Sequence, residues 1–304
     1  MKKILRGAVS TAFRWLPAGM PALIYTKLLR PAPLRRITDR LLLALVPPSV
    51  RLPEGELSLN RSDPVVSGAL ALGVYENFEL QLFRSLIMPG ETVLDVGANI
   101  GLYSIIGAHR TGPAGRVIAC EPEPDNLALL HHNALGVQAQ NISVCACALA
   151  DNDGTLNLYL STDNKGSHSL FGNKNNAQAI SVPVRRGDDL LAELGATPDV
   201  IKIDVEGAEP LVLAGLPKSL TSPSVRLLVE FSPGSLRNGS FDPQEFLDDL
   251  TGRGFICYEI DASRQALREV IFPKKLIARL GPTGYVNLLC VKNRQLTAAF
   301  HVLS

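Results

Sequence analysis

The amino-acid sequence predicts an α/β fold, built on a seven-stranded, mostly parallel sheet with an antiparallel last strand. Short apolar segments without polar alternation recur along the chain, which is typical of parallel strands buried on both faces. Segments with helical spacing separate the first three of them in a β-α-β-α-β order. With 304 residues, 46% of them hydrophobic and 19% charged, the chain can form one large α/β domain with an appendage.

Residues 1–72 are predicted to be a basic, largely helical N-terminal extension and linker. Residues 1–51 carry ten lysines and arginines and one acid, which gives this segment a charge of +9. Since the whole chain has a net charge of +1, the remainder carries −8, and such an acidic body argues against nucleic acid as a partner. No apolar run approaches the roughly 18 residues of a membrane-spanning helix, and Arg6 and Arg14 interrupt the apolar part of a secretory signal.

Two interpretations of this extension stay open. Residues 1–50 form either a helical cap packed on the domain or a basic amphipathic segment that lies on an anionic membrane. Signal-like targeting is a third alternative. We therefore expect a cytoplasmic protein, and under the second interpretation one with peripheral membrane contact through residues 1–50.

Residues 73–293 are predicted to form the main domain, followed by a C-terminal tail over 294–304. The first half of the domain alternates helices and strands that end at glycine or proline. In chain order we expect a helix over 76–88, a strand over 92–96, a helix over 101–109, a strand over 116–120, a helix over 124–135 and a strand over 141–148.

The pattern changes in the middle of the domain. Residues 155–160 and 180–184 alternate apolar and polar side chains, which predicts an antiparallel excursion. The serine-, asparagine- and glycine-rich segment 161–178 between them is either a lid or a surface loop, and His168 within it is a candidate catalytic residue. The second half then continues with helices over 188–194, 208–215 and 243–253 and strands over 200–205, 224–231, 255–260 and 285–291.

The segment 93–104, with the sequence VLDVGANIGLYS, predicts a ligand-binding turn between a buried strand and a helix. Gly97 and Gly101 remove Cβ atoms where a bulky cofactor must lie against the backbone. The segment lacks the G-x-G-x-x-G spacing of a pyrophosphate-binding turn, and the carboxylate of Asp95 ends the strand. An anion there suits a cationic ligand, and S-adenosylmethionine, a nucleoside with an ammonium group and a sulfonium, fits that chemistry.

A second constellation lies in the sequence IKIDVEGAE, residues 201–209. Lys202 and Asp204 interrupt an apolar strand on the same face, where an unpaired charge is costly, so we expect Lys202 to pair with Asp204 or with Glu230 of the next strand. Glu206 and Glu209 follow at a helix start, where the helix dipole alone accounts for Glu209. Lys202, Asp204 and Glu206 are the candidate catalytic residues. The acids also resemble a divalent-cation site, but no histidine accompanies them and no metal ligand is assigned.

The five cysteines form no C-x-x-C pair and all lie in apolar, strand-like segments. They are predicted to be core cysteines of a protein in a reducing compartment. Cys145 and Cys147 share one strand face but offer too few ligands for zinc.

Taken in order, these motifs resemble the FkbM-type methyltransferases. The segment 93–104, Glu121-Pro122, the sequence ALAD at 148–151 and the sequence IKIDVEGAE carry the resemblance, which covers about residues 73–291. The resemblance implies the class I methyltransferase fold, which is Rossmann-like, and S-adenosylmethionine as cofactor. The segment Arg185-Arg186-Gly187 is more basic than the family pattern, which bears either on an acidic acceptor or on a solvated turn.

The resemblance also implies roles for residues of this chain. Asp95, Gly97, Asn99 and Gly101 would line the methionine side of the cofactor. Glu121 would accept hydrogen bonds from the ribose hydroxyls, and Pro122 and Ala148 would flank the adenine. Asp188 matches a family acid to which we assign no role.

The function expected from these observations is O-methylation of a hydroxyl on a sugar, glycolipid or natural product, so the acceptor is a small molecule, glycan or glycolipid. Asp204 or Glu206 would accept the hydroxyl proton, while Lys202 sets the local charge. Two alternatives are a non-catalytic, membrane-associated cofactor-binding protein and an NAD-dependent oxidoreductase, the latter disfavoured by the missing G-x-G-x-x-G.

Overall fold

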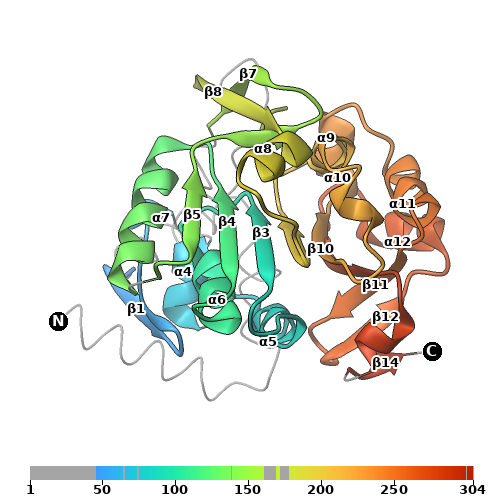
Figure 1. Ribbon diagram of the computed structural model, residues 1–304. Helices are drawn as coiled ribbons and strands as arrows, with labels where there is room; N and C mark the ends of the chain where they lie inside the picture. The colour runs from blue at the N-terminus through green and yellow to red at the C-terminus, as the bar shows by residue number, and fades with distance from the viewer. Residues whose placement is uncertain are drawn as a thin grey trace.

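The structure is a computed structural model that describes residues 46–63, 66–73, 75–137, 139–160, 169–171, 178–298 and 300–303 (Figure 1). Two predictions lie outside or mostly outside these residues. They are the cap or membrane segment over 1–50, of which only 46–50 is described, and the lid or loop with His168. The domain boundaries at 72 and 293 stay predictions.

The segment expected to be a linker contains a hairpin and a short helix. It holds, in order, β1 (Ser49–Leu52), β2 (Gly55–Ser58), which pairs antiparallel with β1, and α4 (Val66–Leu72). Leu57 is fully buried, and the Asn133 side-chain amide bonds both the backbone N–H and the backbone oxygen of Ser58. The apolar alternation here spans too few residues to distinguish a strand from a linker in the sequence.

The central sheet has nine strands among the described residues, in the order β14-β12-β11-β13-β10-β9-β3-β4-β5. Seven of them lie where strands were predicted: β3 (Thr92–Val96), β4 (Arg116–Cys120), β5 (Ile142–Cys145), β9 (Val200–Ile203), β10 (Arg226–Phe231), β11 (Ile256–Asp261) and β13 (Val286–Val291). Strands β5, β4, β3, β9 and β10 are parallel, and β13 runs antiparallel to both of its neighbours. The mostly parallel α/β class with an antiparallel strand is confirmed.

The strand count is larger than the seven predicted, because two short strands extend one edge. These are β12 (Ala266–Glu269) and β14 (Val302–Leu303). A separate three-stranded sheet lies at the top of Figure 1 and consists of β6 (Ala148–Ala150), β8 (Ala179–Arg186) and β7 (Gly154–Tyr159), in that order. Antiparallel pairing of β7 with β8 confirms the predicted excursion. The single strand predicted over 141–148 is divided, because the chain turns out of the central sheet where the N–H of Cys147 donates to the Cys145 oxygen at 2.9 Å.

Eight helices follow α4 in the described residues. They are α5 (Asn77–Leu86), α6 (Leu102–Thr111), α7 (Pro124–Gly136), α8 (Gly187–Glu193), α9 (Glu209–Gly215), α10 (Pro233–Asn238), α11 (Pro243–Gly252) and α12 (Pro273–Leu280). Helices α10 and α12 were not predicted from the sequence; both are short, and each begins at a proline. Within the described part of the chain, none of the helices combines the length and the apolar character that crossing a membrane requires.

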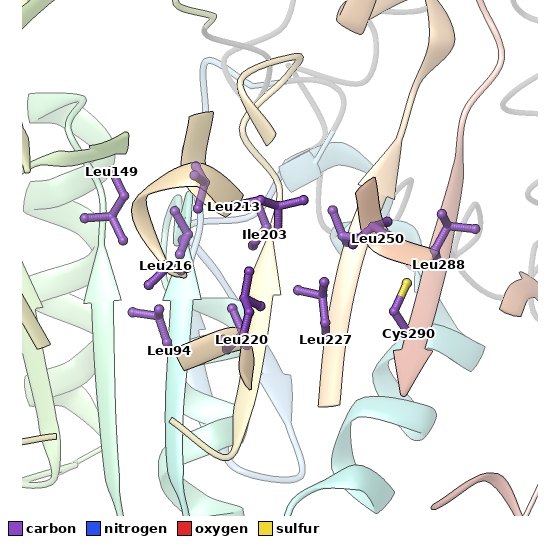
Figure 2. Packing of buried hydrophobic residues seen from close by; sticks show 14 of the residues in the cluster. Leu94, Leu149, Ile203, Leu213, Leu216, Leu220, Leu227, Leu250, Leu288 and Cys290 are labelled. Carbon is purple, nitrogen blue, oxygen red and sulfur yellow. The ribbon is translucent and has the colours of Figure 1, made fainter. Parts of the chain in front are cut away.

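Side chains alternate between the two faces along the central strands, and those on each face belong to a separate hydrophobic cluster. Leu94 of β3 and Leu227 of β10 belong to the first cluster, together with Leu213 of α9 and Leu216, the residue after that helix (Figure 2). Val93, the neighbour of Leu94, belongs to the second cluster, under α5 and α6. Burial on both faces explains why these strands lack polar alternation. It also leaves the strand ends as the place where charged side chains can gather.

Candidate functional site

A cavity of about 310 Å³ lies at the carboxyl ends of the parallel strands. Its walls come from the residues that follow β3, β4, β9 and β10, from β6, and from the segments that precede α5 and β13. This edge of an open α/β sheet is the usual ligand site. Of the ten predicted site residues, eight line the cavity: Gly97, Asn99, Glu121, Pro122, Ala148, Lys202, Asp204 and Glu206.

The turn after β3 forms one wall and is held by backbone contacts. The N–H groups of Gly97 and Ala98 both donate to the backbone oxygen of Cys120, at the end of β4, at 3.0 Å. Gly97 has a φ of +78°, and a Cβ there would lie 1.9 Å from the backbone oxygen of Asp204. Glycine at 97 therefore lets the turns after β3 and β9 touch, which brings the two predicted constellations together.

The two predicted residues that do not line the cavity are Gly101 and Asp95. Gly101 has a φ of +90°, and a Cβ there would lie 2.6 Å from Leu130 Cδ1, so glycine at 101 serves the packing of α6 on α7 instead of making room for a cofactor. Asp95 is fully buried behind the wall and accepts a hydrogen bond from the Ser104 hydroxyl at 2.6 Å. Burial raises the pKa of Asp95, while the charge of Lys202, its neighbour on the paired strand, opposes that rise.

Glu121 joins the turn after β3 to the end of β4. Its carboxylate accepts hydrogen bonds from the backbone N–H of Asn99 at 2.8 Å and from that of Glu123 at 2.9 Å. Burial raises the pKa of Glu121 to about 7, although these two bonds favour the ionised form. A carboxylate with two oxygens keeps further acceptor capacity toward the cavity. Asn99 itself has a φ of +50°, a conformation that asparagine tolerates better than most residues.

Lys202 provides the cavity's positive charge. Its Nζ donates to Asp204 Oδ2 at 3.2 Å and lies 4.6 Å from the centroid of the Tyr103 ring. Asp204, and not Glu230, is therefore the partner among the two that the sequence allowed. Burial alone would lower the pKa of Lys202, but the carboxylates of Asp204, Asp95 and Glu76 together outweigh burial and raise the pKa above its ordinary value.

The segment before α5 contributes an acid that the sequence analysis missed. Glu76 accepts a hydrogen bond from the Tyr103 hydroxyl at 2.6 Å and one from the Asn287 side-chain amide at 3.2 Å, and it lines the cavity. Burial raises its pKa. The only signal in the sequence is one more acid ahead of an amphipathic helix, and such acids are common on solvated surfaces. Its role becomes visible only when α5 is seen packed against α6.

Three carboxylates of the cavity lie close together. One oxygen each from Asp204, Glu206 and Glu230 lie within 4.8 Å of one another. Burial raises the pKa of Glu230 well above its ordinary value, and the charges of Asp204 and Glu206 add to that rise. Oxygen ligands at this spacing could hold a divalent cation. The sequence pattern suggested Glu209 as the third acid, whereas the fold places Glu230 there.

Several other conspicuous side chains have structural partners outside the cavity. Glu209 accepts from the backbone N–H groups of Val205 and Gly207, which closes the turn before α9, as its place at a helix start suggested. Asp188 accepts from two backbone N–H groups and the Ser219 hydroxyl, which anchors the turn after α9. Arg185 forms ion pairs with Asp153 and Glu193, and Arg186 forms one with Asp189. All five cysteines are free thiols, and of these only Cys145 is more than marginally exposed.

The comparisons with known proteins agree on one family. The family model described as the Methyltransferase FkbM domain matches residues 95–257, more than half of the chain. The chain is 31% identical over 160 residues to the 31-O-demethyl-FK506 methyltransferase FkbM of Streptomyces tacrolimicus, which covers 43% of this chain and 61% of that protein. It is 29% identical over 155 residues to Methyltransferase sdnD of Sordaria araneosa, which covers 41% of this chain and 60% of that protein.

Among solved structures, one similar chain is Methyltransferase FkbM from Methylobacillus flagellatus KT. It aligns with a TM-score of 0.42 and 16% identity, over 84% of this chain and 59% of that chain. Each of these matches spans less than two thirds of the length of the protein that it matches.

Proposed function

This chain belongs to the family of the FkbM methyltransferase domain, and on that premise we propose that it transfers a methyl group from S-adenosylmethionine to a hydroxyl of a sugar, glycolipid or natural product. As a member of the family it is an S-adenosylmethionine-dependent methyltransferase with the class I fold. The family match favours neither a non-catalytic binding protein nor an NAD-dependent oxidoreductase. The contact between the turn of Gly97 and the backbone of Asp204 carries the proposal, because it joins the cofactor turn and the charged residues in one cavity.

The residues present fit the cofactor. The turn from Gly97 to Asn99 leaves backbone open to the cavity, and Glu121 has acceptor capacity for two ribose hydroxyls. Pro122 and Ala148 line the same wall and offer apolar contacts for an adenine. When bound, S-adenosylmethionine supplies a methyl group already activated by its sulfonium. Asp95 would act on the site through Lys202 and not by direct contact, since its side chain lies behind the wall.

The proposed task of the remaining residues is to position the acceptor and receive its proton. Burial and the charges of Asp204 and Glu206 raise the pKa of Glu230 well above its ordinary value, which favours its protonated form, so Asp204 and Glu206 are the proposed proton acceptors. Lys202 holds the Asp204 carboxylate in place through a charge-assisted hydrogen bond. Removal of the proton as the hydroxyl oxygen approaches the methyl group requires such a carboxylate within hydrogen-bond reach.

The same proposal includes a glycan or glycolipid acceptor, a cytoplasmic location and peripheral membrane contact through residues 1–50. The charge of +9 over residues 1–51 supports the membrane contact. The family match itself names no acceptor for this chain.

The decisive test separates binding from turnover. The full chain is incubated with methyl-labelled S-adenosylmethionine and with glycan and lipid extracts of cells, and labelled product is counted. Calorimetry with S-adenosylhomocysteine measures cofactor-site binding. Asp204→Asn should keep the affinity for S-adenosylhomocysteine within about threefold but lose roughly 100-fold or more in turnover, as removal of a general base does.

Asp189→Asn is the matched control, because Asp189 is an exposed acid outside the cavity, paired with Arg186. It should leave both quantities unchanged. An equal loss of affinity and turnover in Asp204→Asn would assign Asp204 to the cofactor instead. Label that resists mild alkali supports an ether and hence O-methylation of a hydroxyl, whereas release as methanol would indicate a methyl ester and contradict it. Tight binding of NAD without any response to S-adenosylhomocysteine would overturn the proposal as a whole.

A further inference from the structure

Helix α12 presents a positively charged outer face. Leu276 is buried, and Ile277 packs against the first hydrophobic cluster, so these side chains fix the helix on the domain. Lys274 and Lys275 are exposed on the other side, and neither has an ion-pair partner among the described residues. Arg279, one turn further along, is engaged by Glu259 at 2.7 Å. The outer face therefore carries two uncompensated lysines near its N-terminal end.

Two large apolar side chains stand directly beside these lysines. Ile271 and Phe272, the two residues before α12, are 63% and 60% exposed. The Nζ of Lys275 lies 4.5 Å from the centroid of the Phe272 ring, so the cationic and apolar groups share one surface. We call Ile271, Phe272, Lys274 and Lys275 the α12 patch. An isolated exposed apolar residue needs no explanation, but an adjacent aliphatic and aromatic pair flanked by free lysines does.

The chain that follows α12 reaches the wall of the cavity. The chain leaves α12 through a short loop in which Thr283 and Tyr285 line the cavity, and Tyr285 is also 52% exposed. The loop is fixed to α10, because a Cβ on Gly234 would lie 2.1 Å from the backbone oxygen of Pro282. A helix of eight residues spans about 12 Å. Figure 1 shows α12 beside α11 at the margin of the domain.

We propose that the α12 patch docks this protein on an anionic lipid bilayer. Lysines attract acidic headgroups, while an aliphatic and an aromatic side chain between them insert at the boundary of headgroups and acyl chains. A nucleic acid would use the lysines but leave Ile271 without a partner. The chain outside residues 1–51 carries −8, so most of the domain is repelled by an anionic surface and only an edge with a local positive excess can approach it.

The loop with Thr283 and Tyr285 follows the same helix, so docking through the patch would hold this part of the cavity wall within one short helix of the bilayer. A membrane-anchored acceptor would then reach the cavity without leaving the lipid, a consequence that rests on the proposed methyl transfer. The docking itself does not depend on it.

Co-sedimentation of the full chain with vesicles tests the docking. Vesicles of phosphatidylcholine with phosphatidylserine are compared with vesicles of phosphatidylcholine alone. The wild-type chain should bind the first and not the second, and added salt should weaken binding. Lys274→Gln/Lys275→Gln should lower the partition coefficient about tenfold or more, and Ile271→Ser/Phe272→Ser should lower it by a similar factor.

Matched controls lie on other surfaces. Leu135→Ser removes a side chain that is 80% exposed on α7, and Lys218→Gln removes an exposed lysine, and both should bind as the wild type does. Unchanged affinity for S-adenosylhomocysteine shows that the patch variants are folded. If the serine variant does not fold, the lysine variant, which changes no apolar contact, still tests the proposal.

The proposal would be overturned if the wild-type chain did not bind the vesicles, or if the partition coefficients of the patch variants stayed within twofold of the wild-type value. The second result is expected if residues 1–50 alone bind the vesicles. Loss of self-association or of nucleic-acid binding in the patch variants, without an effect on vesicles, would assign the patch to that other partner. Methyl transfer is measured separately, so its failure leaves this result intact.

Discussion

The two sides of the cavity are built in different ways. The nucleotide side, formed by the turn after β3 and by Glu121, is held by backbone hydrogen bonds between neighbouring strands. The acid side, formed by Lys202, Asp204, Glu206, Glu230 and Glu76, is assembled from the ends of β9 and β10 and from the segment before α5. The first depends on shape, whereas the second depends on a balance of charges in which one buried lysine faces several carboxylates.

The largest effect should follow from breaking that charge balance. Lys202→Met would leave Asp204, Asp95 and Glu76 without their shared cation, and Asp95 is fully buried. Removing one partner of a buried pair costs roughly 3–5 kcal/mol, so the free energy of unfolding at neutral pH should fall by about that amount. Urea unfolding followed by circular dichroism measures it.

Lys218→Met, at an exposed lysine, is the control and should change the stability by less than about 0.5 kcal/mol. Since protonation relieves the unpaired acids, the deficit of Lys202→Met should shrink as the pH is lowered. An equally small effect of both substitutions would mean that Lys202 does not balance the acid side.

The second effect compares two glycines of the same turn. Gly97→Ala places a Cβ 1.9 Å from a backbone oxygen, which cannot move away without separating the turns after β3 and β9. Gly101→Ala meets the flexible end of the Leu130 side chain at 2.6 Å. Both positions have positive φ, which costs alanine roughly 1–2 kcal/mol.

Gly97→Ala should therefore lose roughly 1–3 kcal/mol more stability than Gly101→Ala, and it should also lose affinity for S-adenosylhomocysteine. Thermal unfolding and calorimetry measure the two quantities. Greater loss of cofactor affinity in Gly101→Ala would restore the expectation from sequence that Gly101 faces the cofactor.

The sequence predicted the nucleotide side more completely than the acid side. A contiguous motif places Gly97 and Asn99, and the strand pattern places Glu121 beside them, because parallel strands with short connections leave few arrangements. It did not decide between Asp204 and Glu230 as the partner of Lys202. It also did not show that Glu76 joins them, because that contribution depends on how the segment before α5 packs, 126 positions before Lys202 (202 − 76). Asp95 and Gly101 satisfy the motif pattern, but only side-chain packing shows that they face away from the cavity.

The smallest of the expected effects concerns the pH dependence of the nucleotide side. Burial raises the pKa of Glu121 from its ordinary value of 4.5 to about 7, so the folded protein favours the protonated form. A raised carboxyl pKa contributes stability below the unfolded value, and this contribution is lost as the pH rises from about 4.5 to about 7. Ribose hydroxyls donate to the ionised carboxylate, so cofactor affinity should change in the opposite sense and rise through pH 7.

Calorimetry with S-adenosylhomocysteine between pH 6 and pH 8 tests this, and the predicted increase is up to about tenfold, since one pKa unit corresponds to a factor of ten. Glu121→Gln keeps an acceptor oxygen but cannot ionise, so its affinity should be lower and nearly independent of pH. Glu209→Gln is the control, because burial raises the pKa of Glu209 to about 7 as well, yet its carboxylate bonds only the turn before α9. If Glu209→Gln also abolished the pH dependence, ionisation of Glu121 would not be its cause, and the assignment of Glu121 to the ribose hydroxyls would not hold.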